Sequence, residues 1–154
     1  MARFTAQSES VAALAVDTGF FWAHAVAGGG YKLRRVTLGV RAGVGAPTSQ
    51  QVVVGINRVT TAGTTPTAVT ASRLDPNSPA VTTTFASAFV TPPTTTAQDA
   101  YRIAFNSQSG VDLPWELLEE FIVAAGTANG LGFINRDNAL PSAHQFVISV
   151  EVEE

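Results

Sequence analysis

Residues 31–59 carry the clearest alternation of apolar and polar positions, in two runs separated by a connection at 42–49 that contains glycine and proline. The apolar residues of the first run share one face: Val36, Leu38 and Val40. The second run, 51–59, is rich in β-branched residues and also has an apolar face: Val52, Val54 and Ile56. Val53 points the other way, so we expect this strand to be covered on both faces. Both runs are predicted to be central strands of a sheet.

Other parts of the chain show the same period of two, or a short β-branched run. They predict strands at 20–26, 67–70, 81–85, 101–105, 131–134 and 145–152. In the first of these, Phe20, Trp22 and His24 are expected to form a bulky inner face. Turn signals separate the runs at intervals of about 8–12 residues, among them the triple glycine 28–30. This spacing predicts an all-β protein, an antiparallel β-sandwich or a barrel.

Three segments are less regular. Residues 1–10 are polar without periodicity and are predicted to be a mobile N-terminal arm before a domain at 11–154. Residues 60–96 include 13 threonines and five prolines, and we expect ordered edge strands and long loops there, or a surface that lies against a partner. Residues 113–126 fit either a helix, because Trp115, Leu118 and Ile122 recur at helical spacing, or a bend followed by a strand at 119–124. The pattern alone tilts slightly to the helix.

Composition narrows the function classes. The 154 residues suit one domain, and 45% of them are hydrophobic, which is ample for a core. There is no cysteine, so disulfides and thiolate metal sites are excluded. A net charge of −3 with a single lysine, Lys32, makes nucleic acid a poor partner. No apolar run approaches the roughly 20 residues of a membrane span, so no membrane partner is expected.

Candidate catalytic and metal-binding residues are scarce. We interpret His24 as a packed core histidine and His144 as a surface residue, since neither lies in a metal-binding or catalytic motif. The oxygen-rich stretch 75–78 resembles a calcium loop but is better explained as a turn.

The acidic group Glu116, Glu119 and Glu120 is expected to be an exposed face. Adjacent Arg34 and Arg35 should point to opposite faces and form no patch. We therefore expect no catalytic residue, no cofactor site and no metal site, and no enzyme.

Several soft patterns follow one another from Val11 to the C-terminus. They are FFWAHAV at 20–26, KLRRVTLGV at 32–40, VVVGINR at 52–58, TTAGT at 60–64, LDPNSP at 74–79, GLGF at 130–133, NALP at 138–141 and a last strand ending in Glu153 and Glu154. In this order they resemble a group of small virion proteins of tailed bacteriophages, the head decoration (cement) or minor capsid proteins. The resemblance implies a jelly roll of about eight strands. It also favours a strand over a helix after Trp115, although the pair Leu117 and Leu118 leaves a helical turn at 114–118 open.

The resemblance implies a structural role. Such proteins bind major capsid protein on the outside of an icosahedral head, often as homotrimers, so we expect a homotrimer on the outer surface of the capsid. The alternative is a tail-tip or fibre-head module that binds host carbohydrate, which would need exposed aromatic residues such as Trp115, Tyr31 or Tyr101. A cupin-like or lyase enzyme would need clustered histidines, and the two present are far apart in the sequence.

Overall fold

The computed structural model describes residues 1–64 and 66–154, which form thirteen β-strands and no helix. The strands are β1 (Arg3–Glu9), β2 (Gly19–His24), β3 (Tyr31–Arg41), β4 (Gln51–Thr61), β5 (Thr67–Val69), β6 (Ala71–Arg73), β7 (Thr84–Ser87), β8 (Thr94–Thr95), β9 (Tyr101–Asn106), β10 (Val111–Pro114), β11 (Phe121–Val123), β12 (Gly130–Asn135) and β13 (Gln145–Glu153). Nor does the described part contain a helix of the length and hydrophobicity needed to cross a membrane.

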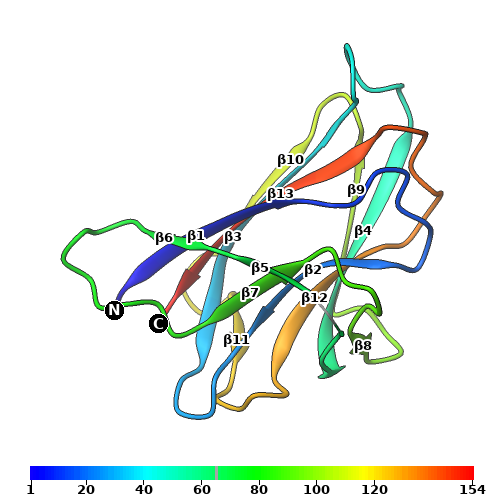
Figure 1. The fold of residues 1–154 in the computed structure, drawn as a ribbon. Helices are drawn as coiled ribbons and strands as arrows, with labels where there is room; N and C mark the ends of the chain where they lie inside the picture. The colour runs from blue at the N-terminus through cyan, green and yellow to red at the C-terminus, as the bar shows by residue number, and fades with distance from the viewer. Residues whose placement is uncertain (65) are drawn as a thin grey trace.

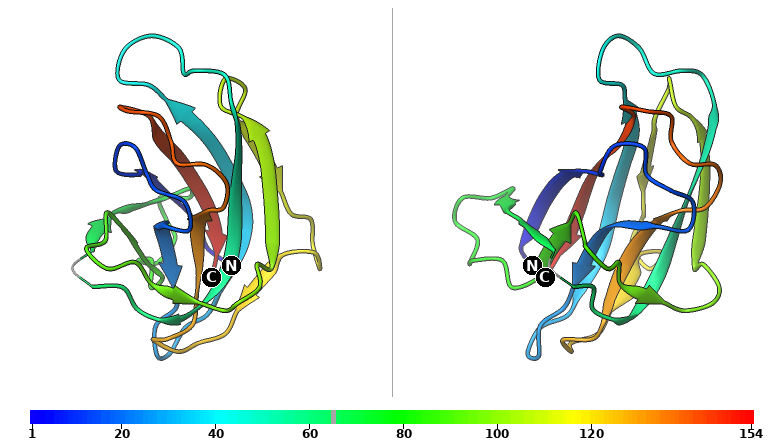
Figure 2. Two further views of the ribbon diagram at one scale, coloured as in Figure 1. Left: turned by 90° about the vertical axis from the view of Figure 1, so that its right-hand side faces the viewer. Right: turned by 45° about the vertical axis from the view of Figure 1, so that its right-hand side comes forward.

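The strands form two antiparallel sheets. The first has the order β10-β3-β13-β1-β6, with β11 also paired to β3, and the second has the order β5-β7-β2-β12-β4-β8, with β9 also paired to β4. The sheets face each other as two layers, and both chain ends lie side by side near β1 and β13 (Figures 1 and 2). The predicted antiparallel β-sandwich is therefore confirmed. The two central strands expected at 31–59 are central, but they lie in opposite sheets.

Four strand pairs are nested along the chain. Strand β1 pairs with β13, β2 with β12, β3 with β10 and β11, and β4 with β9. The pairs are joined laterally, because β13 also pairs with β3 and β12 with β4. The chain thus folds back on itself as one long hairpin, and this hairpin wraps into two layers.

The core lies between the two sheets and follows the alternation in the sequence. Five of the six predicted inward residues are buried, among them Leu38 at 1% exposure and Ile56 at 0%, and Val40 is partly buried against them. Aromatic contacts connect the layers and fill the centre, with the rings of Phe20 and Phe146 stacked at 4.8 Å and those of Phe21 and Phe133 edge-on at 5.7 Å. Fully burying side chains of this kind contributes about 1.5–3 kcal/mol each, which makes this cluster the main stabilising feature.

The predicted mobile arm at 1–10 is wrong, because residues 3–9 form β1 inside the first sheet. All seven residues of β1 pair with β13, and Phe4 and Ala6 are buried in the core. With only two apolar residues in alternation, the pattern is too weak to predict a strand. Two paired neighbours, β13 and β6, compensate for the weak local preference.

A β-bulge reverses the predicted faces of β2. The register with β12 passes from Phe133 opposite Phe21 to Ile134 opposite Gly19, which leaves Phe20 as the extra residue. Phe20 and Phe21 consequently both join the core, whereas Trp22 packs on the far side of the sheet in a smaller cluster. The prediction that Phe20, Trp22 and His24 form one inner face is therefore wrong.

The irregular segments are strands and turns. Residues 60–96, apart from Thr65, which lies outside the described residues, supply the short strands β5 to β8 and long connections, as predicted. The bend-and-strand alternative for 113–126 is confirmed, since β10 ends at Pro114, turns follow and β11 begins at Phe121. Leu118 lies in the turn with φ of 75°, a left-handed conformation that ends any local helical pattern.

Candidate functional site

Neither histidine lies as predicted. His24 is half-buried on the outer side of β2, where its ring stacks on Trp22 at 4.1 Å and contacts the Thr84 hydroxyl. Burial lowers the pKa of His24, although a hydrogen bond to its neighbouring carbonyl opposes this. His144 is buried rather than exposed. Its Nε2 atom accepts a hydrogen bond of 3.0 Å from the backbone N–H of Thr48, and this bond holds the 42–50 loop against the ring.

The oxygen-rich stretch at 75–78 forms a turn, as predicted. The Asp75 carboxylate accepts the backbone N–H of Asn77 at 2.9 Å, and its carbonyl accepts that of Ser78 at 3.0 Å. Across residues 1–64 and 66–154, no three or more histidine, aspartate or glutamate side chains gather closely enough to hold a metal ion.

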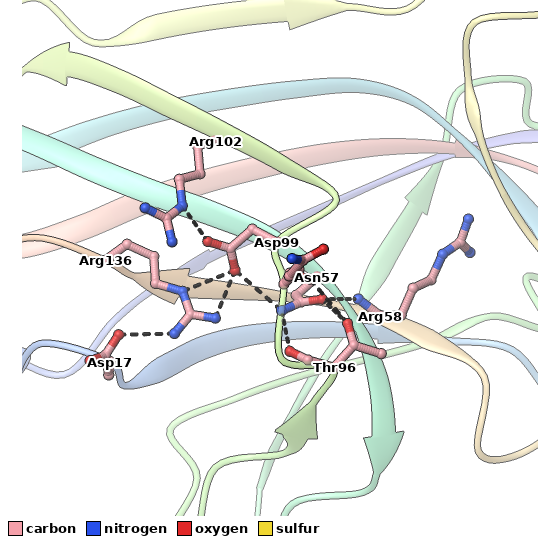
Figure 3. Close-up of polar contacts among 8 residues, drawn as sticks. Asp17, Asn57, Arg58, Thr96, Asp99, Arg102 and Arg136 are labelled. Carbon is pink, nitrogen blue, oxygen red and sulfur yellow. Dashed lines mark hydrogen bonds and ion pairs between the residues drawn. The ribbon is translucent and has the colours of Figure 1, made fainter.

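A polar network that the sequence analysis missed centres on Asp99, between β8 and β9 (Figure 3). The Asp99 side chain is only 2% exposed, and it accepts hydrogen bonds from Arg136 at 2.7 and 3.0 Å and from Arg102 at 2.6 Å. Asn57, fully buried on β4, donates to the same carboxylate at 3.2 Å. Arg136 also binds exposed Asp17, so the network joins segments from four parts of the chain.

The network covers the outer face of β4. A Cβ atom on Gly55 would lie 2.8 Å from the Asp99 carboxyl group, so only glycine leaves room for the network there. Burial opposes ionisation of Asp99, but the hydrogen bonds from Arg136 and Arg102 outweigh it and hold the pKa below the ordinary value. The prediction that β4 is covered on both faces is confirmed, and the cover is polar. The network therefore acts as a structural clamp.

A second group of charges lies on the outer face of the first sheet. A bulge at Arg34, where Glu151 opposes Arg35 but Val152 opposes Leu33, places both arginines on this face, contrary to prediction. Arg34 donates three hydrogen bonds of 3.0 to 3.1 Å to the Glu153 carboxylate. It also lies 3.5 Å from Glu120, whose side chain is 1% exposed.

All three glutamates at 116–120 were predicted to be exposed. Glu116 and Glu119 are exposed, but Glu120 is buried, so the prediction is wrong for Glu120. The backbone amide of Glu120 stabilises its carboxylate, burial opposes this, and Lys32 and Arg34 add further stabilisation, so that its pKa is lowered. Six charged side chains, three of each sign, therefore neutralise one another at this face: Arg3, Lys32, Arg34, Glu120, Glu151 and Glu153.

Three aromatic rings close the side of the sandwich where both sheets end. Trp115 and Phe121, from the first sheet, contact each other edge-on at 5.5 Å, and Tyr101, from the second sheet, lies 6.2 and 6.4 Å from them. Tyr101 is 42% exposed. Tyr31, the third aromatic candidate, is excluded from any surface role, because it is buried and its hydroxyl donates to the Ala23 carbonyl at 2.6 Å.

Three large aliphatic side chains on the same segment as Trp115 and Phe121 are also exposed, and Ile122 projects on the face of β11 opposite to Phe121. Leu117, Leu118 and Ile122 are 66%, 91% and 59% exposed. We call the six residues the aromatic edge: Tyr101, Trp115, Leu117, Leu118, Phe121 and Ile122. Scattered exposed apolar residues are ordinary, but several on one short segment beside an aromatic cluster are typical of an interaction site.

An open groove of about 570 Å³ lies beside the aromatic edge, on the outer face of the first sheet. Its walls combine one aromatic ring with charges, of which all but that of Glu116 are paired: Arg3, Arg34, Arg35, Trp115, Glu116 and Glu151. The volume is within the range of small-molecule sites, about 300–1,000 Å³.

Comparisons of the chain with protein-family models, with curated proteins and with solved structures found no match. The most distinctive surface of the described residues is the aromatic edge with the adjoining groove. The sequence signals for it were the two aromatic candidates Trp115 and Tyr101, but their proximity depends on β9 and β10 lying at the same side of the two sheets.

Proposed function

We propose that this protein is a structural virion protein that decorates the outside of a tailed-phage icosahedral capsid. It binds major capsid protein as a homotrimer. The nested strand pairing supports the jelly-roll part of this proposal, because jelly rolls are double-sheet sandwiches of about eight principal strands. The proposal rests otherwise on the resemblance in the sequence.

The observation that carries an assembly role is the aromatic edge. A lone soluble domain gains nothing from leaving Leu118 91% exposed in a left-handed conformation that branched residues rarely adopt. Protein partners bury such groups, and aromatic residues are enriched in the centres of protein interfaces.

Fractionation of phage particles tests this function. Heads, tails and the particle-free lysate are separated, and the protein is quantified in each by mass spectrometry. The proposal predicts the protein in the head fraction at a constant ratio to major capsid protein. Its recovery in the tails or only in the lysate would contradict the proposal.

A second candidate, carbohydrate binding by a tail-tip or fibre-head module, is favoured by the groove. Sugar sites combine an aromatic surface with polar groups held in fixed positions, and here Trp115 adjoins arginines that are fixed by carboxylates.

Trp115 also provides the readout for this second function. The other tryptophan, Trp22, is 4% exposed, so a saccharide that changes the intrinsic fluorescence should act through Trp115. Titration with bacterial surface saccharides should leave the fluorescence of the decoration protein unchanged. A saturable change that is lost in Trp115→Phe would favour the sugar-binding function instead.

A further inference from the structure

We infer that the aromatic edge is the surface through which this chain binds a second copy of itself. This inference rests on the homotrimer part of the proposed function and adds the contacting residues. Three independent features of the described structure support it: apolar exposure, unpaired strand edges and complementary charges.

The apolar exposure is concentrated at one place. Large exposed hydrophobic residues elsewhere, such as Val44 and Val90, stand singly on loops. At the aromatic edge, three exposed aliphatic residues lie within six positions of the chain, 117–122, on the segment that also carries Trp115 and Phe121 of the ring cluster. Water contact with this group is the unfavourable term that association would remove.

Both sheets end at this side of the molecule. Strand β9 is paired to β4 alone, and β11 is paired to β3 alone. The outer edge of β9 has no strand partner among the described residues, and an open edge of low charge invites pairing. On β11 the Ile122 carbonyl already accepts a hydrogen bond from Arg58. The only charged residue of β9 is Arg102, which is held by Asp99, and β11 has none. A neighbouring copy that covers the aromatic edge also covers these two strands.

The margin of the aromatic edge carries charges of both signs. Glu116 and Glu119 are exposed and form no ion pair with any described residue. Arg58 is likewise exposed and has no carboxylate partner in that part of the chain, and its guanidinium is held at the aromatic edge by a 2.7 Å hydrogen bond to the Ile122 carbonyl. Between two copies, Arg58 of one can meet Glu119 of the other, so the surface is complementary to itself.

A contact with a second copy must reach beyond the six residues of the aromatic edge. A stable interface buries about 800 Å² on each partner and involves about 20–30 residues a side. The contact must therefore extend over the charged margin, where the self-complementary pairs lie. Such interfaces usually have aromatic and aliphatic residues at the centre and charged residues at the rim.

Substitutions at Leu118 separate an interface role from a role in folding. Leu118→Gly removes the side chain and suits the φ of 75°, so it should keep or raise the melting temperature of the subunit. If Leu118 is buried between copies, the same change should raise the Kd for assembly at least about tenfold, because interface centres carry most of the binding energy. Leu118→Glu should give the monomer. Val44→Glu, at a 96% exposed position in the 42–50 loop at the other end of the sandwich, is the matched control (Figure 1).

Light scattering behind a sizing column measures the assembly, and circular dichroism checks the fold of each variant. Wild type and Val44→Glu should be trimers, also at about 1 M sodium chloride, where the screening length is only about 3 Å. Arg58→Glu should weaken assembly, and the added Glu119→Arg should restore it.

The outcomes are distinguishable. A monomeric wild type overturns this inference together with the homotrimer. A trimer that persists in folded Leu118→Glu overturns the inference and leaves the homotrimer in place. Absence of the protein from phage heads would refute the proposed function, but it would not change the molar masses of the assemblies that light scattering measures.

Discussion

Replacing Asp99 by asparagine tests the polar clamp over β4. The substitution keeps the side-chain volume but removes the charge that Arg136 and Arg102 share. It also turns an amide N–H₂ group towards donors, since Asn57 and both arginines donate to the carboxylate. Replacement of Asp99 should therefore lower the free energy of unfolding more than replacement of most other polar residues.

The magnitude follows from burial. Breaking a fully buried ion pair typically costs about 3–5 kcal/mol, and losing one hydrogen bond to a charged group about 1.5–3 kcal/mol. Asp99 is 2% exposed, but Arg136 is 16% and Arg102 65% exposed, so both arginines recover some hydration. We expect Asp99→Asn to lower the free energy of unfolding by about 2–4 kcal/mol.

Asp17→Asn is the matched control, because Asp17 binds the same Arg136 at 2.9 Å but its side chain is 67% exposed. An exposed pair of this kind contributes about 0.2–1 kcal/mol. Asparagine also tolerates the φ of 55° at this position, so no strain is added. Urea denaturation followed by circular dichroism gives both free energies.

The pH dependence provides a second check. The pKa of folded Asp99 lies below 3.8, so its contribution is complete well above that value and is lost as the pH falls through the folded pKa. The difference between wild type and Asp99→Asn should therefore shrink in acid. Equal costs for Asp99→Asn and Asp17→Asn at neutral pH would refute the reasoning.

Three further predictions concern the core, a histidine and metals. Leu38→Ala should cost about 2–5 kcal/mol, since Leu38 is 1% exposed; a urea midpoint that gives a change within about 0.5 kcal/mol would refute the assignment of faces. Burial lowers the pKa of His24 in the folded protein below 6.5, the value for the unfolded chain. The wild type should therefore lose stability as the pH falls through 6.5, because the unfolded chain then binds the proton more readily. Melting curves from neutral to mildly acidic pH should show a smaller loss in His24→Gln, and an equal loss would contradict this. A chelator should leave the melting temperature unchanged, whereas a fall of more than a few degrees would indicate a metal site at Asp75.

The strands with strong alternation could be predicted from the sequence, and the bulges could not. In β3 and β13 the period of two gave the correct inner faces. In β2 one extra residue at Phe20 changed which side chains meet the core, and in β3 the extra residue at Arg34 brought two arginines to one face. A bulge is fixed by the register with a neighbouring strand, which a local pattern does not contain.

The polar contacts were harder still. Asp99 and Arg136 are 37 positions apart, and Glu120 meets Arg34 only because β11 and β3 are paired. One local signal for the clamp was present, however. Gly55 interrupts a run of β-branched residues, and a glycine inside a strand often marks the close approach of another group.

The aromatic edge was predictable only as separate residues. Tyr101 and Trp115 were recognised as candidate surface aromatics, but their 6.2 Å contact crosses from one sheet to the other. Leu117 and Leu118 looked like part of a helix or bend, with no indication of exposure. The strand topology supplies that information, since β9, β10 and β11 all lie at the side where the sheets end.

The most direct test of the central claim is electron microscopy of phage heads with and without this protein. Heads assembled without it are imaged bare and again after the purified protein is added back. The account predicts added density on the outer surface of the shell, three copies to each site, with the aromatic edges in contact at the centre of each trimer. Shells that stay bare at saturating protein, or density confined to the tail, would contradict it.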